Sequence, residues 1–199
     1  MVTERQVKPL KYKSLPGLSE KQLSEHHSVL YAGYVKKINE INLKMETAAP
    51  ADANATFSLI RELKLEETFA LNAIKLHEGY FDNMGGDGQA KGTIKDQIAK
   101  DFDSFEKWEE QFRAMGIAAR GWVVLAYDLD DGKLHNYLCD VHNQGGVWGA
   151  IPILILDVYE HAYFLDYGTG RKAYIEAFMK TIEWKEVDNR YQKVKGWKV

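Results

Sequence analysis

Asp157 and His161 are two residues whose types and spacing could bind a metal ion. They lie four residues apart, directly after the apolar run from Ala150 to Leu156. The run predicts a buried strand, and a carboxylate at the end of a buried strand costs much free energy unless it is paired or bound to a metal. We therefore expect a positive charge beside Asp157.

Histidines elsewhere in the chain could complete a metal site. His26 and His77 each fall on the apolar face of a predicted helix. One histidine on such a face is more often a core residue than a ligand. Together with Asp157 and His161, however, these two would supply three nitrogens and one oxygen. Such a ligand set suits iron, manganese or zinc.

The N-terminal part predicts an irregular arm and a first helix. The arm, residues 1–19, contains two prolines. Ser19 followed by Gln22 is typical of a helix N-cap. A helix should follow, and its predicted buried stripe consists of His26, Leu30, Tyr34, Ile38 and Ile41. These residues are four, four, four and three positions apart, which is the spacing of one helix face.

A second helix is predicted from about Ala55 to Asn83, after a loop over residues 47–54. Its predicted buried face consists of Ala70, Ala73, Ile74, His77 and Phe81. The glycine-rich segment from Gly85 to Gly88 should end this hairpin. We place a domain boundary there, which gives a hairpin domain over 1–88 and a second domain over 89–199.

The second half predicts a mixed α/β domain. An Asp131-Gly132 turn between two β-rich runs is typical of a β-hairpin. The order of elements predicts an α+β fold: an N-terminal antiparallel α-helical hairpin, then an α/β domain with a three-stranded antiparallel sheet flanked by helices. The expected helices cover about 93–100, 104–119 and 171–187, and the expected strands cover 122–127, 133–139 and 151–156.

Composition limits the possible partners. The net charge is -3, so no broad basic field exists to hold nucleic acid or an anionic membrane. No apolar run approaches the roughly 20 residues of a membrane span, and residues 1–5 lack the apolar core of a signal peptide. The single cysteine, Cys139, excludes an internal disulfide. We expect a cytoplasmic protein without nucleic-acid or membrane partners.

The segment Asp157-Val158-Tyr159-Glu160-His161-Ala162-Tyr163 resembles the Asp-x-Trp-Glu-His-Ala-Tyr signature of the iron/manganese superoxide dismutases. The resemblance extends along nearly the whole chain. It includes Lys8-Pro9-Leu10, His26, Tyr34-Val35, His77, Gly121-Trp122, Ile151-Pro152 and the last helix.

By this resemblance, His26, His77, Asp157 and His161 bind one Fe or Mn ion per subunit, with a water or hydroxide as fifth ligand. The implied activity is superoxide disproportionation by ping-pong redox cycling. One superoxide reduces the metal and leaves as dioxygen, and a second oxidises it and leaves as hydrogen peroxide. Tyr34 matches the tyrosine beside the family's substrate funnel.

The hydrogen-bonding residues around the implied metal depart from the common family pattern. Iron-type members often place a glutamine where this chain has Ala73, and manganese-type members supply one from the loop before the third strand. Counting back from Asp157 without a gap aligns His142 with members that use histidine in this role. We therefore expect His142 to hydrogen-bond the metal-bound solvent. Gln144 is the alternative, and it would require a short shift of the loop.

Aromatic residues are retained around the implied pocket. Tyr159 replaces the tryptophan of the signature, and Phe81 replaces the tryptophan after the second ligand. Trp122 is expected to pack against a wall of the pocket. The aromatic bulk at these positions is compatible with a dry site.

The resemblance also implies a homodimer, with a tetramer as the alternative. Glu160 resembles the glutamate that reaches across the dimer interface to the partner's matching histidine. Leu30 replaces a common histidine that hydrogen-bonds a tyrosine of the partner subunit, so we expect Tyr163 to lose that contact. His27 and Tyr31 lie nearby in sequence and are candidates to compensate.

The sequence leaves more than one function open. The first is superoxide dismutase activity. The second is a catalytically altered relative that binds metal or has a structural or interaction role, because a fold does not guarantee a function. A third and weaker hypothesis is a mononuclear iron oxygenase. Retention of all four ligand positions favours the first. The choices between iron and manganese, and between dimer and tetramer, stay open.

Overall fold

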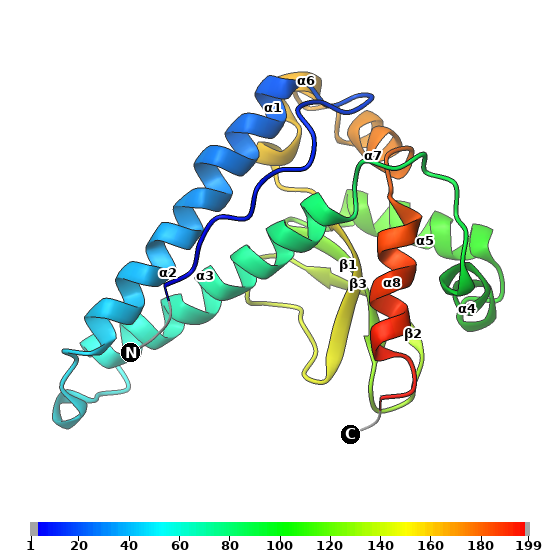
Figure 1. The fold of residues 1–199 in the computed structure, drawn as a ribbon. Helices are drawn as coiled ribbons and strands as arrows, with labels where there is room; N and C mark the ends of the chain where they lie inside the picture. Colours follow the sequence, from blue (N-terminus) through cyan, green and yellow to red (C-terminus); the bar gives the residue numbers. More distant parts are fainter. Residues whose placement is uncertain (1–3, 198–199) are drawn as a thin grey trace.

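A computed structural model describes residues 4–197, which form a long helical hairpin beside an α/β part (Figure 1). Residues 1–3, which belong to the stretch assessed for a signal peptide, and residues 198–199 lie outside the described residues. The elements are α1 (Glu20–Ser24), η1 (Glu25–Tyr31), α2 (Ala32–Met45), η2 (Pro50–Asp52), α3 (Leu59–Asp82), α4 (Thr93–Asp101), α5 (Phe105–Ala118), β1 (Trp122–Asp128), β2 (Leu134–Cys139), β3 (Ala150–Asp157), η3 (Glu160–Ala162), α6 (Phe164–Tyr167), α7 (Arg171–Met179) and α8 (Trp184–Val194).

The first helix begins as predicted but contains a π-helical turn. Ser19 is the N-cap and accepts a hydrogen bond from the Gln22 amide. Within η1, the regular 3.6-residue repeat is lost because a π-helical turn holds more residues. Tyr31 is therefore buried, whereas Leu30 is 37% exposed. The prediction that Leu30 belongs to the buried stripe was wrong.

The second helix begins later than predicted, at Leu59. Ser58 is its N-cap and accepts a hydrogen bond from the Arg61 amide. A short 3-10 turn, η2, lies within the predicted loop. The predicted buried face is confirmed for Ala70, Ala73, Ile74, His77 and Phe81. This helix runs beside α2, so the hairpin is antiparallel (Figure 1).

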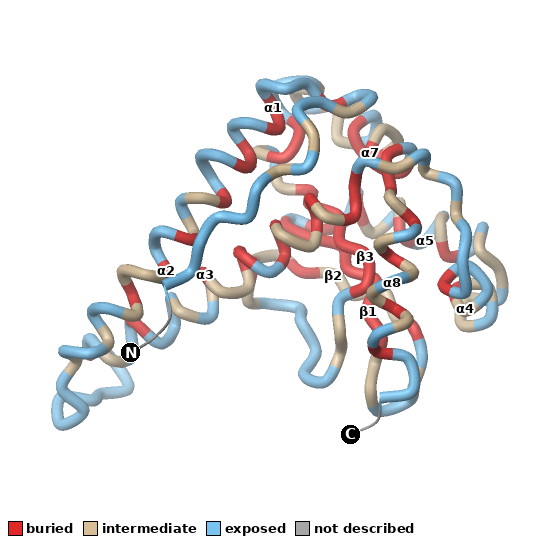
Figure 2. The backbone as a smooth tube through the Cα atoms, in the orientation of Figure 1, coloured by how far each residue is buried: buried red, intermediate tan, exposed pale blue. Residues whose placement is uncertain are grey.

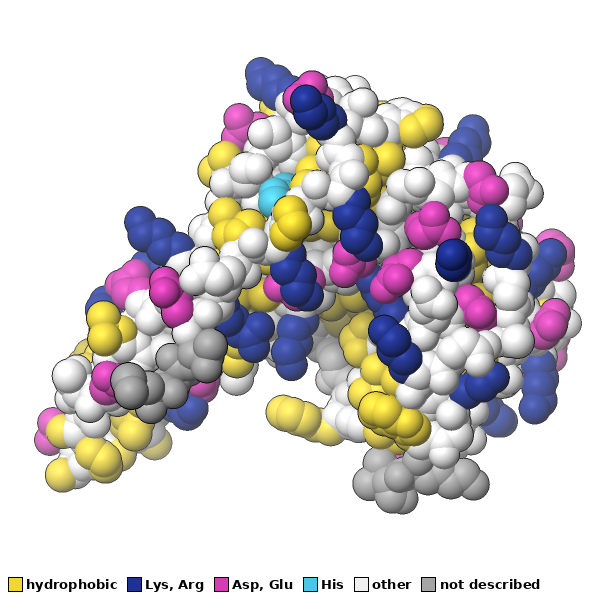
Figure 3. Space-filling model, viewed as in Figure 1, with side chains coloured by type: hydrophobic (Ala, Val, Ile, Leu, Met, Phe, Trp, Pro, Cys, Tyr) yellow, Lys and Arg dark blue, Asp and Glu magenta, His cyan; other side chains and the backbone are white. Residues whose placement is uncertain are grey.

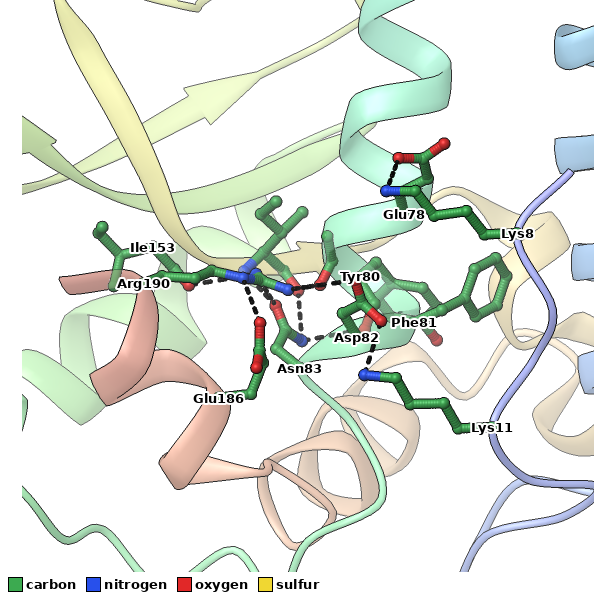
Figure 4. A network of polar contacts seen from close by, with 12 residues as sticks. Lys8, Lys11, Glu78, Tyr80, Phe81, Asp82, Asn83, Ile153, Glu186 and Arg190 are labelled. Atoms are coloured by element: carbon green, nitrogen blue, oxygen red, sulfur yellow. Dashed lines mark hydrogen bonds and ion pairs between the residues drawn. The ribbon is translucent and has the colours of Figure 1, made fainter. Parts of the chain in front are cut away.

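The N-terminal arm lies along the hairpin (Figure 1), and contacts of Lys8 hold it there. The Lys8 amide donates to the Tyr31 hydroxyl at 3.0 Å, and the Lys8 carbonyl lies 2.8 Å from His27 Nε2. The Lys8 ammonium also pairs with Glu78, as Figure 4 shows. His27 and Tyr31 therefore bind the arm, and whether they also compensate for Leu30 stays open.

Three antiparallel strands in the order β2-β1-β3 form the sheet. Because β1 is central, its first residue, Trp122, pairs with Asp157 at the end of β3 and with Cys139 at the end of β2. β1 and most of β3 are buried, whereas the middle of β2 is of intermediate exposure (Figure 2). The register thus brings Trp122 and the end of β2 to the level of the carboxylate that the sequence singled out.

The last predicted helix is two helices, α7 and α8. Ile182, between them, forms an isolated antiparallel bridge with Met84, so the intervening backbone leaves the helical conformation. The predicted fold class is confirmed: a helical hairpin precedes an α/β part with a three-stranded antiparallel sheet. Residues of both parts share one hydrophobic core. The domain division near residue 88 stays a prediction.

Asn83 follows α3 and bonds the free edge of β3. Its side-chain oxygen accepts from the Ile155 amide at 2.9 Å, and its side-chain nitrogen donates to the Ile155 carbonyl at 3.2 Å. Arg190 of α8 donates to the Gly79 and Ile153 carbonyls in the same network (Figure 4). These bonds tie α3 and α8 to β3. Among residues 4–197, no helix has both the length and the apolarity needed to cross a membrane.

Candidate metal centre

Four side chains from separate elements converge in the interior. His26 comes from η1, His77 from α3, Asp157 from the end of β3 and His161 from η3. One potential ligand atom from each lies within 4.8 Å of all the others. The first three are fully buried, whereas the side chain of His161 is 26% exposed. The four residues proposed as ligands from the sequence therefore form one cluster.

The three imidazoles surround a single oxygen, Asp157 Oδ2. The distance from this oxygen to Nε2 is 3.1 Å for His26, 3.2 Å for His161 and 3.7 Å for His77. The other carboxylate oxygen accepts from the Tyr159 amide at 2.9 Å. The Tyr159 amide thus orients the carboxylate, whose other oxygen faces the three histidines.

The donor atoms fit a metal ion. His77 Nδ1 lies 2.7 Å from the Ala73 carbonyl, so Nδ1 carries the proton and Nε2 presents a lone pair toward Asp157. Burial lowers the pKa values of His26 and His77, which keeps both in the neutral form that binds metals. Among the described residues, neither Nε2 atom has a hydrogen-bond partner. A cation between these nitrogens and the carboxylate would satisfy all of them.

Asp157 is the negative charge of the cluster. Burial opposes that charge, but attraction and a hydrogen bond from His161, together with the nearby His26 ring, hold the pKa of Asp157 well below its usual value. The carboxyl group is therefore ionised. In a metal-bound centre, three imidazoles with one carboxylate make a hard-to-borderline donor set that iron and manganese accept.

Gln22 anchors the segment that carries His161, and the sequence analysis missed this role. Its side-chain nitrogen donates to the His161 carbonyl at 2.6 Å, and its side-chain oxygen accepts from the Leu165 amide at 3.0 Å. Gln22 is almost fully buried. The available signal was a glutamine in the first turn of a helix. The sequence analysis interpreted this glutamine only as part of the N-cap pattern.

His142 lies at the edge of the cluster with both ring nitrogens in use. Trp122 Nε1 donates to His142 Nδ1 at 3.0 Å, and His142 Nε2 lies 3.0 Å from the Tyr34 hydroxyl. Gln144, the alternative from the sequence, is exposed. Trp122 thus has a polar contact in addition to the packing role expected for it.

Aromatic rings enclose the cluster. Phe81 is buried with its ring centroid 5.0 Å from that of His26, and the Tyr159 ring stacks on His161 at 5.1 Å. Phe69, which the sequence analysis missed, lies 4.6 Å from the His142 ring. Its spacing of eight residues before His77 on the same helix was the signal that could have identified it.

Tyr163 has a hydrogen-bond partner within its own chain. Its hydroxyl accepts from Arg171 Nε at 3.1 Å, and the side chain is buried within its own chain. The expected loss of a contact between Tyr163 and the partner subunit at position 30 stays a prediction. Glu160 and Leu30 are exposed.

Comparisons with known proteins identify relatives of this chain. Residues 90–190 match a family model described as the C-terminal domain of iron/manganese superoxide dismutases. The chain is 40% identical over 189 residues to the superoxide dismutase [Fe] of Aquifex aeolicus, covering 92% of this chain and 89% of that protein. It is 41% identical to the [Fe] protein of Cupriavidus metallidurans, covering 89% and 90%. It is 36% identical to superoxide dismutase [Mn] 2 of Haloferax volcanii, covering 92% of each.

Proposed function

The chain belongs to the iron/manganese superoxide dismutase family, and we propose that it disproportionates superoxide at one Fe or Mn ion held by His26, His77, Asp157 and His161. The observation that carries this proposal is the convergence of three Nε2 atoms on Asp157 Oδ2. The metal, when bound, supplies the one-electron oxidation and reduction that convert superoxide to dioxygen and hydrogen peroxide.

The protein contributes orientation, a dry site and protons. The Ala73 carbonyl fixes the ring of His77, and the Tyr159 amide fixes Asp157. The surrounding aromatic rings exclude water, which strengthens electrostatic interactions within the site. Tyr34 and His142 are the hydrogen-bonded groups beside the cluster that hold exchangeable protons. We assign them the proton supply that peroxide formation requires.

Metal analysis and activity together test this function. The natively expressed protein should contain stoichiometric iron or manganese and consume superoxide, and reconstitution with each metal should show which one supports turnover. Full metal content without superoxide-dependent turnover would instead support the catalytically altered relative. The names of the relatives include both metals, so the choice between iron and manganese rests on this experiment.

Replacing His142 with alanine should leave metal content near the wild-type value but shift the reduction potential and the pH profile of activity. His142 is not one of the four clustered ligands, yet it holds the Tyr34 hydroxyl. Redox titration and rates across pH measure the effect. Gln144→Ala is the control, because this residue is exposed. An unchanged profile for His142→Ala with an altered one for Gln144→Ala would transfer the role to Gln144.

We propose that the subunit forms a homodimer through the surface around Glu160. The partly exposed side chain of His161 lies beside it. Phe164 and Leu165, which follow shortly after in sequence, are exposed, as are Val29 and Leu30, which follow the ligand His26. In this dimer Glu160 would contact His161 of the partner subunit. Such a contact would orient a ligand imidazole from outside the chain.

Glu160→Ala should weaken the dimer, because it removes a charged contact to the partner at the centre of the interface. Sedimentation velocity over a range of protein concentrations measures the dissociation. Glu110→Ala is the matched control, since Glu110 is an exposed glutamate on α5. A Glu160→Ala dimer that persists undiminished at low concentration would contradict this interface.

A tetramer remains the alternative assembly. Hydrophobic side chains gather at the free end of the hairpin (Figure 3), including the exposed residues Leu43, Phe57, Leu59 and Leu65. Exposed apolar patches often mark interaction sites. The same sedimentation experiment distinguishes the two assemblies by mass.

Two further expectations are also proposals. We propose a cytoplasmic location, which the free and buried Cys139 supports. We also propose that the hairpin over 1–88 and the α/β part over 89–199 are separate domains, which the change in architecture after α3 supports.

A further inference from the structure

Trp122, His142 and Tyr34 form a linear hydrogen-bonded trio beside the metal cluster. The indole nitrogen of Trp122 lies 3.0 Å from His142 Nδ1. The other ring nitrogen, Nε2, lies 3.0 Å from the Tyr34 hydroxyl oxygen. Trp122 and His142 are buried. The direction of each hydrogen bond in this trio follows from the number of N–H and O–H protons that the three side chains carry.

The indole decides the protonation of His142. An indole N–H can donate but cannot accept, so His142 Nδ1 must present a lone pair to Trp122. A neutral imidazole carries one proton, which then lies on Nε2 and is donated to the Tyr34 oxygen. Burial lowers the pKa of His142 to about 4, in agreement with a neutral ring. The hydroxyl proton of Tyr34 is thus the one N–H or O–H proton that forms no hydrogen bond within the trio.

We propose that Trp122 is a positioning residue that holds His142 in the Nε2–H tautomer, so that Tyr34 rather than His142 provides the trio's free hydrogen-bond donor. This inference rests on the proposed function for the identity of the acceptor, a superoxide-derived or solvent oxygen in the centre. It assigns the free proton to Tyr34, whereas the sequence led us to expect that His142 hydrogen-bonds the metal-bound solvent. Its single N–H is already given to Tyr34.

A glutamine in place of His142 would behave differently. Its side-chain oxygen could accept from Trp122 while its amide nitrogen offered two protons. One proton would bond Tyr34, and the other would stay available as a second donor. The histidine therefore makes Tyr34 the sole free donor of the trio, and the dependence on Trp122 is a property of this histidine.

Nitrogen-15 NMR of the full chain, loaded with Zn²⁺ as a diamagnetic ion, tests the assignment. In the wild type, His142 Nδ1 should show a pyridine-type shift and Nε2 a pyrrole-type shift. A coupling across the hydrogen bond should connect Trp122 Nε1 with His142 Nδ1. In Trp122→Phe, the tautomer ratio should move roughly fivefold or more toward Nδ1–H, the change that corresponds to one net hydrogen bond.

Trp108→Phe is the matched control. Trp108 is also buried and donates its indole N–H to Asn136 Oδ1 at 3.1 Å. This variant should leave the tautomer of His142 unchanged. A protonated Nδ1 in the wild type, an absent coupling to Trp122, or an unchanged ratio in a folded Trp122→Phe variant would each overturn the proposal.

The wild-type spectrum decides the tautomer and the donor even if Trp122→Phe does not fold. None of these measurements requires superoxide turnover. The protein could lack dismutase activity and still show the Nε2–H tautomer and the coupling. That result would contradict the proposed function but would support the role of Trp122.

Discussion

His161→Ala is expected to abolish metal retention and, with it, superoxide dismutase activity. His161 is the one ligand whose side chain is partly exposed, so its loss opens the centre to water as well as removing a nitrogen donor. The two remaining imidazoles and Asp157 would leave open coordination positions, and the affinity should fall because it rests on ligand number and geometry. Plasma emission spectrometry of the purified variant measures the metal content.

His135→Ala is the control for this experiment. His135 lies on β2 and pairs with Asp131 on the surface, so its removal should leave the metal content unchanged. Circular dichroism of both variants would show whether the fold is retained. A full metal content in a folded His161→Ala variant would show that His161 is not a ligand.

Asn83→Ala is expected to lower the free energy of unfolding by about 2–4 kcal/mol. The side chain of Asn83 is fully buried and bonds both backbone groups of Ile155. Alanine would leave the amide and carbonyl of a buried residue without these partners, which costs far more than an exchange of bonds with water. Ile155 precedes Asp157 by two residues on the same strand, so the ligand should also lose order.

Asn39→Ala is a matched control for the Asn83 experiment. Asn39 bonds both backbone groups of Arg5 at 2.9 Å in the same two-bond arrangement, but on the exposed surface. Water can replace those bonds, so Asn39→Ala should cost less than about 1 kcal/mol. Urea unfolding of both variants gives the comparison. Equal costs for the two variants would contradict the importance of burial at Asn83.

The sequence by itself determined the types and the chain order of the four clustered residues. Asp157 and His161 stand in one local segment, and His26 and His77 lie on helix faces whose apolar repeats are visible in the sequence. The N-cap at Ser19 is likewise a local signal, because its partner lies three residues away. Such features depend on neighbours in the chain, and the sequence analysis identified them.

Only the tertiary structure decided how the cluster is supported. The bonds from Asn83 to Ile155, from His142 to Tyr34 and from Gln22 to His161 span 72, 108 and 139 residues, so no local pattern marks them. The π-helical turn that exposes Leu30 breaks the repeat on which helix prediction rests. The direction that we infer for the bonds through His142 follows from a tryptophan 20 residues away, on β1. Side-chain partners distant in the chain are chosen by the packed fold, and they are what orients the metal-binding residues.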